Sequence, residues 1–275
     1  MDNVNEFFAT LSSCLWGWPM IVLLLGTHVF LTIRLRFPQR KLFTAIRLSV
    51  QRDKSQKGDV SQFGALATAL AATIGTGNII GVATAVALGG PGAVFWCWLT
   101  GVFGISTKYS EALLAIKYRV KSEGGRMQGG PMYTLERGLG WRKMGILFAV
   151  FTAIAAFGIG CTVQANAIST IMHASYGIST EVCGGVLMLL AAAVIIGGVK
   201  SISRVCSMLV PFMALLYVLG CIYILYVNGS YVAPALKLII SSAFSPEAAG
   251  GGFAGGSVIM AARYGIARGL FSNES

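Results

Sequence analysis

Residues 68–90 read TALAATIGTGNIIGVATAVALGG, an apolar stretch that is long enough to cross a membrane as a helix. Its middle, residues 73–78, reads TIGTGN. Glycine and threonine are weak helix formers and asparagine is polar, so this centre disfavours a regular helix. At membrane depth no water satisfies freed backbone groups. A break is therefore tolerated only where protein buries it or where it lines a cavity.

Two interpretations of this centre remain open. In the first, Gly77 and Gly81 form a small-residue face for close helix packing, with Thr and Asn side chains bonding between helices. In the second, the helix unwinds, and the N–H groups of Thr76 and Gly77 point into a central cavity where they can hold a carboxylate. The carbonyls before the break and the Asn78 side chain can then hold a cation such as Na⁺, as in discontinuous transporter helices.

The composition indicates that most of the chain lies in a membrane. Of its 275 residues, 55% are hydrophobic and only 11% are charged, whereas about a quarter of a soluble domain is charged. Runs of about 20 apolar residues are typical of membrane helices, and barrel strands are about half as long. We predict an all-α integral membrane fold with about seven transmembrane helices, at residues 15–33, 64–88, 92–116, 144–172, 181–198, 206–227 and 253–271.

The basic residues predict how the chain crosses the membrane. Residues 34–57 and 117–143 are rich in Lys and Arg, whereas residues 89–91 and 173–180 contain none. Basic links stay in the cytoplasm, which places the N-terminus outside. The net charge of +11 then reflects topology and contact with anionic lipid, and it does not predict a nucleic-acid partner.

The sequence lacks the motifs of common intramembrane and soluble enzymes. It contains neither H-E-x-x-H nor G-x-S-x-G, and no pair of carboxylates falls at membrane depth. The six cysteines are scattered without a C-x-x-C pair, so we interpret them as small apolar residues rather than as a metal or disulfide framework. We therefore predict a protein that is not an enzyme and needs no cofactor.

Two further polar residues lie inside predicted membrane segments. Gln164 lies in GIGCTVQANAIS, and an uncharged amide at this depth faces the bundle interior. It either makes hydrogen bonds between helices or contacts a substrate. His28 lies inside residues 15–33, and we interpret it as a packing residue rather than as a titratable group in transport.

Four stretches resemble the alanine/glycine:cation symporter family. They are ALAATIGTGNIIGVATAVALGGPGAVFWCWLTGVFG (69–104), RMQGGPMYTLERGLG (126–140), VQANAIS (163–169) and GGFAGGSVIMAARYGIARGLFSNE (251–274). The resemblance implies eleven membrane helices, the last ten of which form two inverted five-helix repeats as in the bacterial leucine transporter. Residues 1–275 would then form a single membrane domain, with a peripheral first helix (15–33), the first five-helix repeat (64–228) and the incomplete start of the second repeat (253–275).

The resemblance also implies a function. It implies secondary active symport of a small neutral amino acid, alanine or glycine, coupled to Na⁺ or H⁺ in the bacterial plasma (inner) membrane. Gly75 and Gly77 would leave room only for a small amino acid beside the backbone. The implied substrate contacts are Thr73, Gly75, Thr76, Gly77, Gln164, Ser272 and Asn273. The implied cation ligands are Ala71, Thr73, Ile74 and Asn78. The sequence does not indicate an oligomeric state.

The sequence ends at Ser275, whereas the resemblance implies a further Gly-rich break and four more helices. Ser272 and Asn273 fall where the first helix of the second repeat is expected to break. An alternating-access transporter needs both repeats. The alternative expectation is therefore a truncated, non-transporting membrane fragment.

Overall fold

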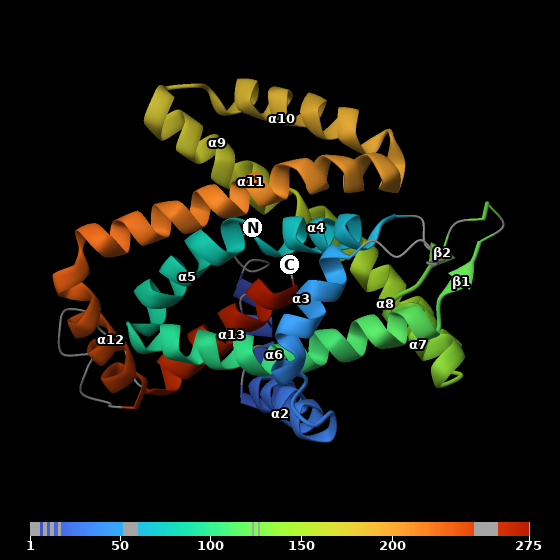
Figure 1. Ribbon diagram of the computed structural model, residues 1–275, viewed down its shortest axis with the longest axis horizontal. Coiled ribbons are helices and arrows are strands. Elements are labelled where there is room, and N and C mark those ends of the chain that lie inside the picture. The colour runs from blue at the N-terminus through green and yellow to red at the C-terminus, as the bar shows by residue number, and fades with distance from the viewer. Residues whose placement is uncertain are drawn as a thin grey trace. The chain divides into compact units, whose positions relative to one another are not determined.

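The computed structural model describes residues 6–7, 10–11, 14–15, 18–51, 60–122, 124–125, 127–244 and 258–274, and most of them are helical (Figure 1). The α-helices from Trp18 onward are α2 (Trp18–Arg34), α3 (Leu42–Val50), α4 (Gln62–Thr73), α5 (Thr76–Gly89), α6 (Gly92–Lys117), α7 (Pro131–Gly138), α8 (Arg142–Ala155), α9 (Thr162–Tyr176), α10 (Thr180–Ile195), α11 (Gly198–Val227), α12 (Gly229–Phe244) and α13 (Val258–Glu274). A 3₁₀ turn covers Pro38–Lys41, and a π-helical turn, η2, covers Ala156–Gly160. The strands β1 (Val120–Lys121) and β2 (Met127–Gln128) form an antiparallel pair.

Several helices are long and apolar enough to cross a membrane. Among the described residues these are Gln62–Gly89, Arg142–Tyr176 and Gly198–Val227, with a fourth if Pro19–Arg34 and Pro38–Val50 count as one span. The helices Thr180–Ile195 and Gly229–Phe244 are apolar but shorter. The all-α, membrane-capable character is confirmed, and the described residues of the predicted segments lie mostly in helices. Residues 253–257 of the last predicted segment lie outside the described part of the chain. The number of seven crossings and the inverted repeat stay predictions.

The chain forms two compact units, and each is described by itself. Unit 1 contains Met1–Lys41, Gly77–Tyr109 and Val218–Ser275, and unit 2 contains Leu42–Thr76 and Ser110–Tyr217. The chain passes from unit 2 to unit 1 immediately after the interruption between α4 and α5. The single membrane domain expected from the sequence stays a prediction.

In unit 1, the core lies where α2, α6 and α13 meet. Ile21 of α2 packs against Ala262 and Ile266 of α13, and all three are at most 5% exposed. Small residues allow the close approach of α13 to α6, because a Cβ on Gly265 would lie only 2.8 Å from the Cβ of Trp96. The α2 and α13 helices therefore contact one another as well as α6 (Figure 1).

A buried polar network also joins α2 to α6. The Thr32 hydroxyl contacts the Ser106 hydroxyl at 2.8 Å and the His28 carbonyl at the same distance. The Gln39 amide nitrogen donates to the Ser106 hydroxyl at 3.0 Å, and His28 Nδ1 lies 2.6 Å from the Thr107 hydroxyl. His28 is 4% exposed. The structure thus gives His28 a polar partner between helices, which fits the interpretation of a packing residue.

We expect Thr32→Val to lower the free energy of unfolding by about 1 kcal/mol, because the Ser106 and Gln39 side chains lose a buried hydrogen-bonding partner. The measurement is denaturant unfolding of the detergent-solubilised protein, followed by intrinsic fluorescence. Thr27→Val is the matched control, since the exposed Thr27 hydroxyl bonds to the Leu23 carbonyl of its own helix, at 2.6 Å. Equal stabilities of the two variants would contradict a stabilising role for the network.

In unit 2, α4 packs closely against α11. A Cβ on Gly64 would lie 3.6 Å from the Ser207 hydroxyl and would overlap the Ser203 hydroxyl. The α9 and α10 helices form an antiparallel pair joined by residues 177–179, and the Ser179 side chain caps α10 by accepting from Val182 N–H (Figure 1). These contacts lie at the start of α4 and at the end of α9, one helix length away from the predicted site residues of each.

Two elements were not expected from the sequence. The link after residue 227 contains α12, although Pro234 lies inside this helix and Lys237 follows it. The strands β1 and β2 pair within the basic link 117–143. The predicted segment 144–172 is also divided, because the π-helical turn η2 separates α8 from α9.

Candidate functional site

The helix of residues 62–89 is interrupted at Ile74 and Gly75. The α4 helix ends at Thr73, and the Ile74 N–H donates to the Leu70 carbonyl at 2.7 Å. Ile74 then leaves helical geometry, with φ −84° and ψ 89°, and α5 begins at Thr76. The interruption is two residues long, so it is shorter than the predicted stretch 73–78, and residues 62–89 still form one stretch of membrane-spanning length.

The end of α4 presents backbone carbonyls at this interruption. A helix leaves its last four carbonyls without partners in the helix, and the predicted cation ligands Ala71, Thr73 and Ile74 lie at this end. The hydroxyl of Thr73 donates to the Ala69 carbonyl at 2.8 Å, so it bonds to its own helix. The prediction for Thr73 concerns its carbonyl, and a cation role for that oxygen stays a prediction.

The structure brings Gln164 to Gly75 within unit 2. A Cβ added to Gly75 would lie 3.1 Å from Gln164 Nε2 and 3.6 Å from Gln164 Oε1. Both residues are half-buried. The side-chain amide of Gln164 therefore lies directly over the backbone of the interruption. The sequence predicted both residues as substrate contacts, and their proximity is the first geometric support for this pairing.

A π-helical turn positions Gln164. The turn covers Ala156–Gly160, and Gln164 lies in the first turn of α9 that follows. The Thr162 hydroxyl donates to the Gly158 carbonyl, and the Cys161 thiol lies 3.7 Å from the Phe157 carbonyl. Such π turns recur at functional sites in other proteins. The glycines of AFGIG are the sequence signal from which this irregular turn could have been suspected.

The start of α5 carries the remaining residues of the predicted broken-helix site. Thr76, Gly77 and Asn78 form its first turn, where backbone N–H groups have no partner within a helix. Asn78 is half-buried, and its side-chain oxygen Oδ1 is inaccessible to solvent. This arrangement fits the predicted use of the N–H groups for an anion and of Asn78 for a cation. Both roles stay predictions.

Arg268 of α13 lies against α5 within unit 1. A Cβ added to Gly81 would overlap the guanidinium group of Arg268, so a larger residue at this position would require the arginine side chain to shift. The sequence had singled out Gly81 as a packing residue, but nothing in it linked Gly81 to Arg268. The next residue, Gly269, packs on α6, where a Cβ would lie 3.2 Å from the Cys97 carbonyl.

Ser272 and Asn273 lie in the last turn of α13, which extends to Glu274. The helix therefore continues through the position where a break was expected. Their side chains fall outside the described part of the structure, so their contact with substrate stays a prediction.

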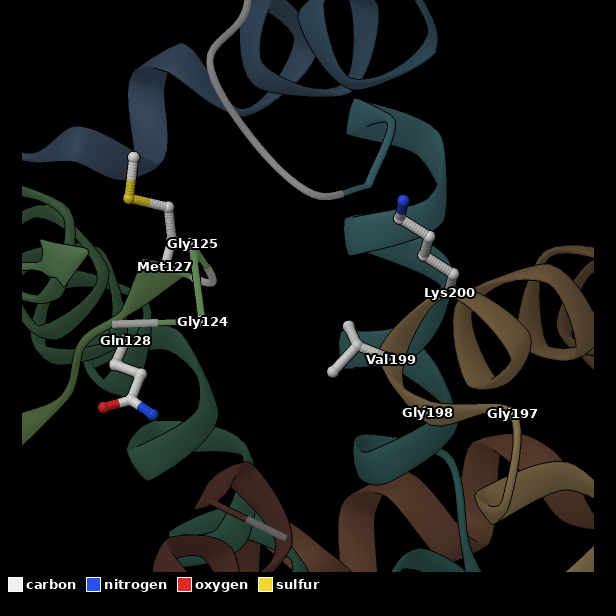
Figure 2. Close-up of a pocket in the computed structure, with 8 residues that line it drawn as sticks. All are labelled: Gly124, Gly125, Met127, Gln128, Gly197, Gly198, Val199 and Lys200. Atoms are coloured by element: carbon white, nitrogen blue, oxygen red, sulfur yellow. The ribbon is translucent and has the colours of Figure 1, made fainter. Parts of the chain in front are cut away.

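A pocket of about 600 Å³ lies elsewhere in unit 2. Figure 2 shows Met127 and Gln128 of β2 on one side and Val199 and Lys200 at the start of α11 on the other. Its other lining residues are Gly124, Gly125, Gly197 and Gly198. The predicted substrate and cation residues do not line this pocket, and one of its walls comes from the basic link 117–143, which the sequence predicts to be cytoplasmic.

Comparisons with known proteins identify the family. The sodium:alanine symporter family matches residues 1–275. The chain is 51% identical to an uncharacterized transporter of Haemophilus influenzae over 99% of this chain and 60% of that protein. It is 50% identical to the sodium/alanine symporter AgcS of Methanococcus maripaludis over 100% of this chain and 61% of that protein. It is 41% identical to the putative sodium/proton-dependent alanine carrier YrbD of Bacillus subtilis over 98% of this chain and 55% of that protein.

The chain spans 55–61% of the length of these three curated relatives. The family and the relatives are transporters rather than enzymes. With a family match over every residue and identities of 41–51% over nearly its whole length, the chain belongs to the sodium:alanine symporter family.

Proposed function

We propose that the chain forms part of a secondary active symporter that carries a small neutral amino acid, alanine or glycine, together with Na⁺. The observation that carries this proposal is the interrupted helix of residues 62–89 with the Gln164 amide over Gly75. Family membership supports it, and so does the printed name of the sodium/alanine symporter AgcS. The relative YrbD is named as sodium/proton-dependent, so H⁺ remains the alternative coupling ion.

In this proposal the interruption holds both solutes. The substrate carboxylate accepts hydrogen bonds from the N–H groups of Thr76 and Gly77, at the positive end of the α5 dipole. One Na⁺ takes the carbonyls of Ala71 and Ile74, and a second takes the Thr73 carbonyl and the Asn78 side chain. Neutral oxygens are suitable ligands for a monovalent cation at membrane depth, because they stabilise it without adding buried charge.

The site selects for small side chains because little space remains beside Gly75. The Gln164 amide nitrogen lies 3.1 Å from the position that even a single methyl group would occupy. An amide offers both a donor and an acceptor, so Gln164 can bond to either end of an amino acid. Ser272 and Asn273 complete the proposed set of substrate contacts from α13.

The proposed location is the bacterial plasma membrane, with the N-terminus outside and the basic links in the cytoplasm. Large apolar side chains are exposed along α10 and α11, including Leu189, Leu190 and Leu216. An exposed apolar helix of the length of α11 is suited to crossing lipid.

The test is uptake of radiolabelled alanine by proteoliposomes that contain the intact gene product. We expect uptake to require an inward Na⁺ gradient and to stop when choline replaces Na⁺, while excess glycine competes and excess leucine does not. A proton uncoupler distinguishes Na⁺-driven from H⁺-driven uptake, because it dissipates the proton gradient and should leave Na⁺-driven uptake intact. Alanine uptake that is independent of both ion gradients would overturn the proposal.

A further inference from the structure

The α3 helix, light blue in Figure 1, presents an exposed apolar stripe. At about 100° per residue, the side chains of Leu42, Phe43, Ile46 and Val50 fall within one arc of about 100° around the helix. Phe43 is 84% exposed, and Ile46 and Val50 are each more than half exposed. The α3 helix contacts α4, yet none of its nine residues is buried. Its packing within unit 2 therefore leaves the stripe open.

The chain around this stripe is strongly basic. Arg47 lies on α3 itself, one helical turn after Phe43, and is exposed at the edge of the stripe. A short helix whose apolar face is flanked by Lys and Arg is typical of helices that lie at the boundary between lipid headgroups and acyl chains. Residues 34–52 contain no Asp or Glu and six basic residues, Arg34, Arg36, Arg40, Lys41, Arg47 and Arg52.

Length and charge indicate what covers the stripe. Nine helical residues rise about 14 Å, roughly half the thickness of the hydrocarbon layer, so α3 does not cross a membrane by itself. A second copy of this chain would bring a net charge of +11 towards the same basic segment and would be repelled. An anionic bilayer surface offers acyl chains for the stripe and negative headgroups for the basic residues. Charge complementarity therefore favours anionic lipid.

We propose that α3 is an interfacial helix that binds the anionic phospholipids of the membrane in which the protein lies. Phe43, Ile46 and Val50 insert between the acyl chains, and the Arg47 guanidinium donates hydrogen bonds to phosphate oxygens, whose geometry matches its planar fork. No part of this binding involves the amino acid or the coupling ion, so the inference stands apart from the proposed function.

The experiment labels the intact gene product with photoactivatable phospholipids in nanodiscs made of equal parts of phosphatidylglycerol and phosphatidylcholine. A trace of one or the other lipid carries a diazirine in its acyl chain, and mass spectrometry maps the adducts on Ile46 and Val50. In the wild-type protein, the phosphatidylglycerol probe should label these residues on the order of tenfold more than the phosphatidylcholine probe. The reason is that each basic residue near the surface favours anionic lipid by about fivefold.

Arg47→Gln should lower labelling by the phosphatidylglycerol probe by about fivefold and leave labelling by the phosphatidylcholine probe unchanged. Arg47→Lys keeps the charge and should retain most of the wild-type preference. The matched control is Arg142→Gln, which removes one positive charge outside α3, where Arg142 Nε lies 3.7 Å from the Glu136 carboxylate. This control should leave both labelling yields unchanged.

Phe43→Ser tests the apolar stripe. It should lower labelling of Ile46 and Val50 by both probes by at least about threefold, because the helix loses its largest inserted side chain. Leu48→Ser is the matched control, since Leu48 is also more than half exposed but lies on the opposite side of α3. Equal losses in the two variants would contradict insertion through the stripe.

Three further outcomes would overturn the inference. Equal labelling of the wild-type protein by the two probes would show that α3 does not select anionic lipid. The absence of labelling by either probe would show that protein, rather than lipid, covers the stripe. Unchanged phosphatidylglycerol labelling in Arg47→Gln would show that Arg47 does not bind the headgroup. None of these results bears on symport, because alanine uptake is measured separately.

Discussion

Gly75→Ala in the intact gene product is expected to raise the alanine concentration for half-maximal uptake by about tenfold, equivalent to about 1.4 kcal/mol of lost binding. The physical reason is the closeness of Gln164. The new Cβ would lie 3.1 Å from its amide nitrogen, which is tighter than an ordinary contact, so the amide must move away. A displacement of this kind misplaces a proposed substrate contact, and it also fills the space that the proposal assigns to the amino acid.

The measurement is the concentration dependence of alanine uptake at saturating Na⁺. Glycine, which lacks a side chain, should lose less affinity than alanine in the same variant. Gly26→Ala is the matched control, because a Cβ on Gly26 meets no atom within 4 Å and should leave uptake unchanged. A Gly75→Ala protein with wild-type alanine affinity would show that the substrate lies elsewhere.

Asn78→Ala is expected to raise the Na⁺ concentration for half-maximal uptake by about tenfold, because a buried ligand oxygen is lost from the proposed cation site. The Oδ1 atom of Asn78 is inaccessible to solvent, so water cannot simply take its place without local rearrangement. The uptake rate at saturating Na⁺ should fall much less than the Na⁺ affinity. A loss of Na⁺ affinity that exceeds the loss of maximal uptake rate distinguishes a cation ligand from a residue that only supports the fold.

The measurement is alanine uptake as a function of Na⁺ concentration at saturating alanine. Asn228→Ala removes an exposed asparagine whose side chain bonds to the Ile224 carbonyl, at 2.9 Å, and should not change the Na⁺ dependence. Should Asn78→Ala keep the wild-type Na⁺ dependence, Asn78 is not a cation ligand. The two variants together distinguish substrate binding from cation binding. Gly75→Ala should lower mainly the affinity for alanine, and Asn78→Ala should lower mainly the affinity for Na⁺.

Local features of the sequence are enough to locate the interruption of the helix. Glycine and threonine disfavour helix wherever they occur, so the residues TIGTGN by themselves predict the position of the break. The structure narrows it to Ile74 and Gly75. The β1–β2 hairpin was missed because its strands are two residues long, which is too short for an alternating pattern. The α12 helix was missed because Pro234 and Lys237 interrupt its apolar run.

The sequence by itself determined the membrane class, the helical fold and the place of the break, because composition and helix propensity are properties of neighbouring residues. The sequence also indicated the family, because the motifs that match the family are continuous stretches of residues. Only the tertiary structure decided which distant residues meet: Gln164 and Gly75 within unit 2, and Arg268 and Gly81 within unit 1. Hydrophobic periodicity predicts which face of a helix is buried, but it does not predict which other helix packs against that face. The π-helical turn before α9 and the absence of a side chain at Gly81 set these contacts, and both act through packing rather than through local sequence preference.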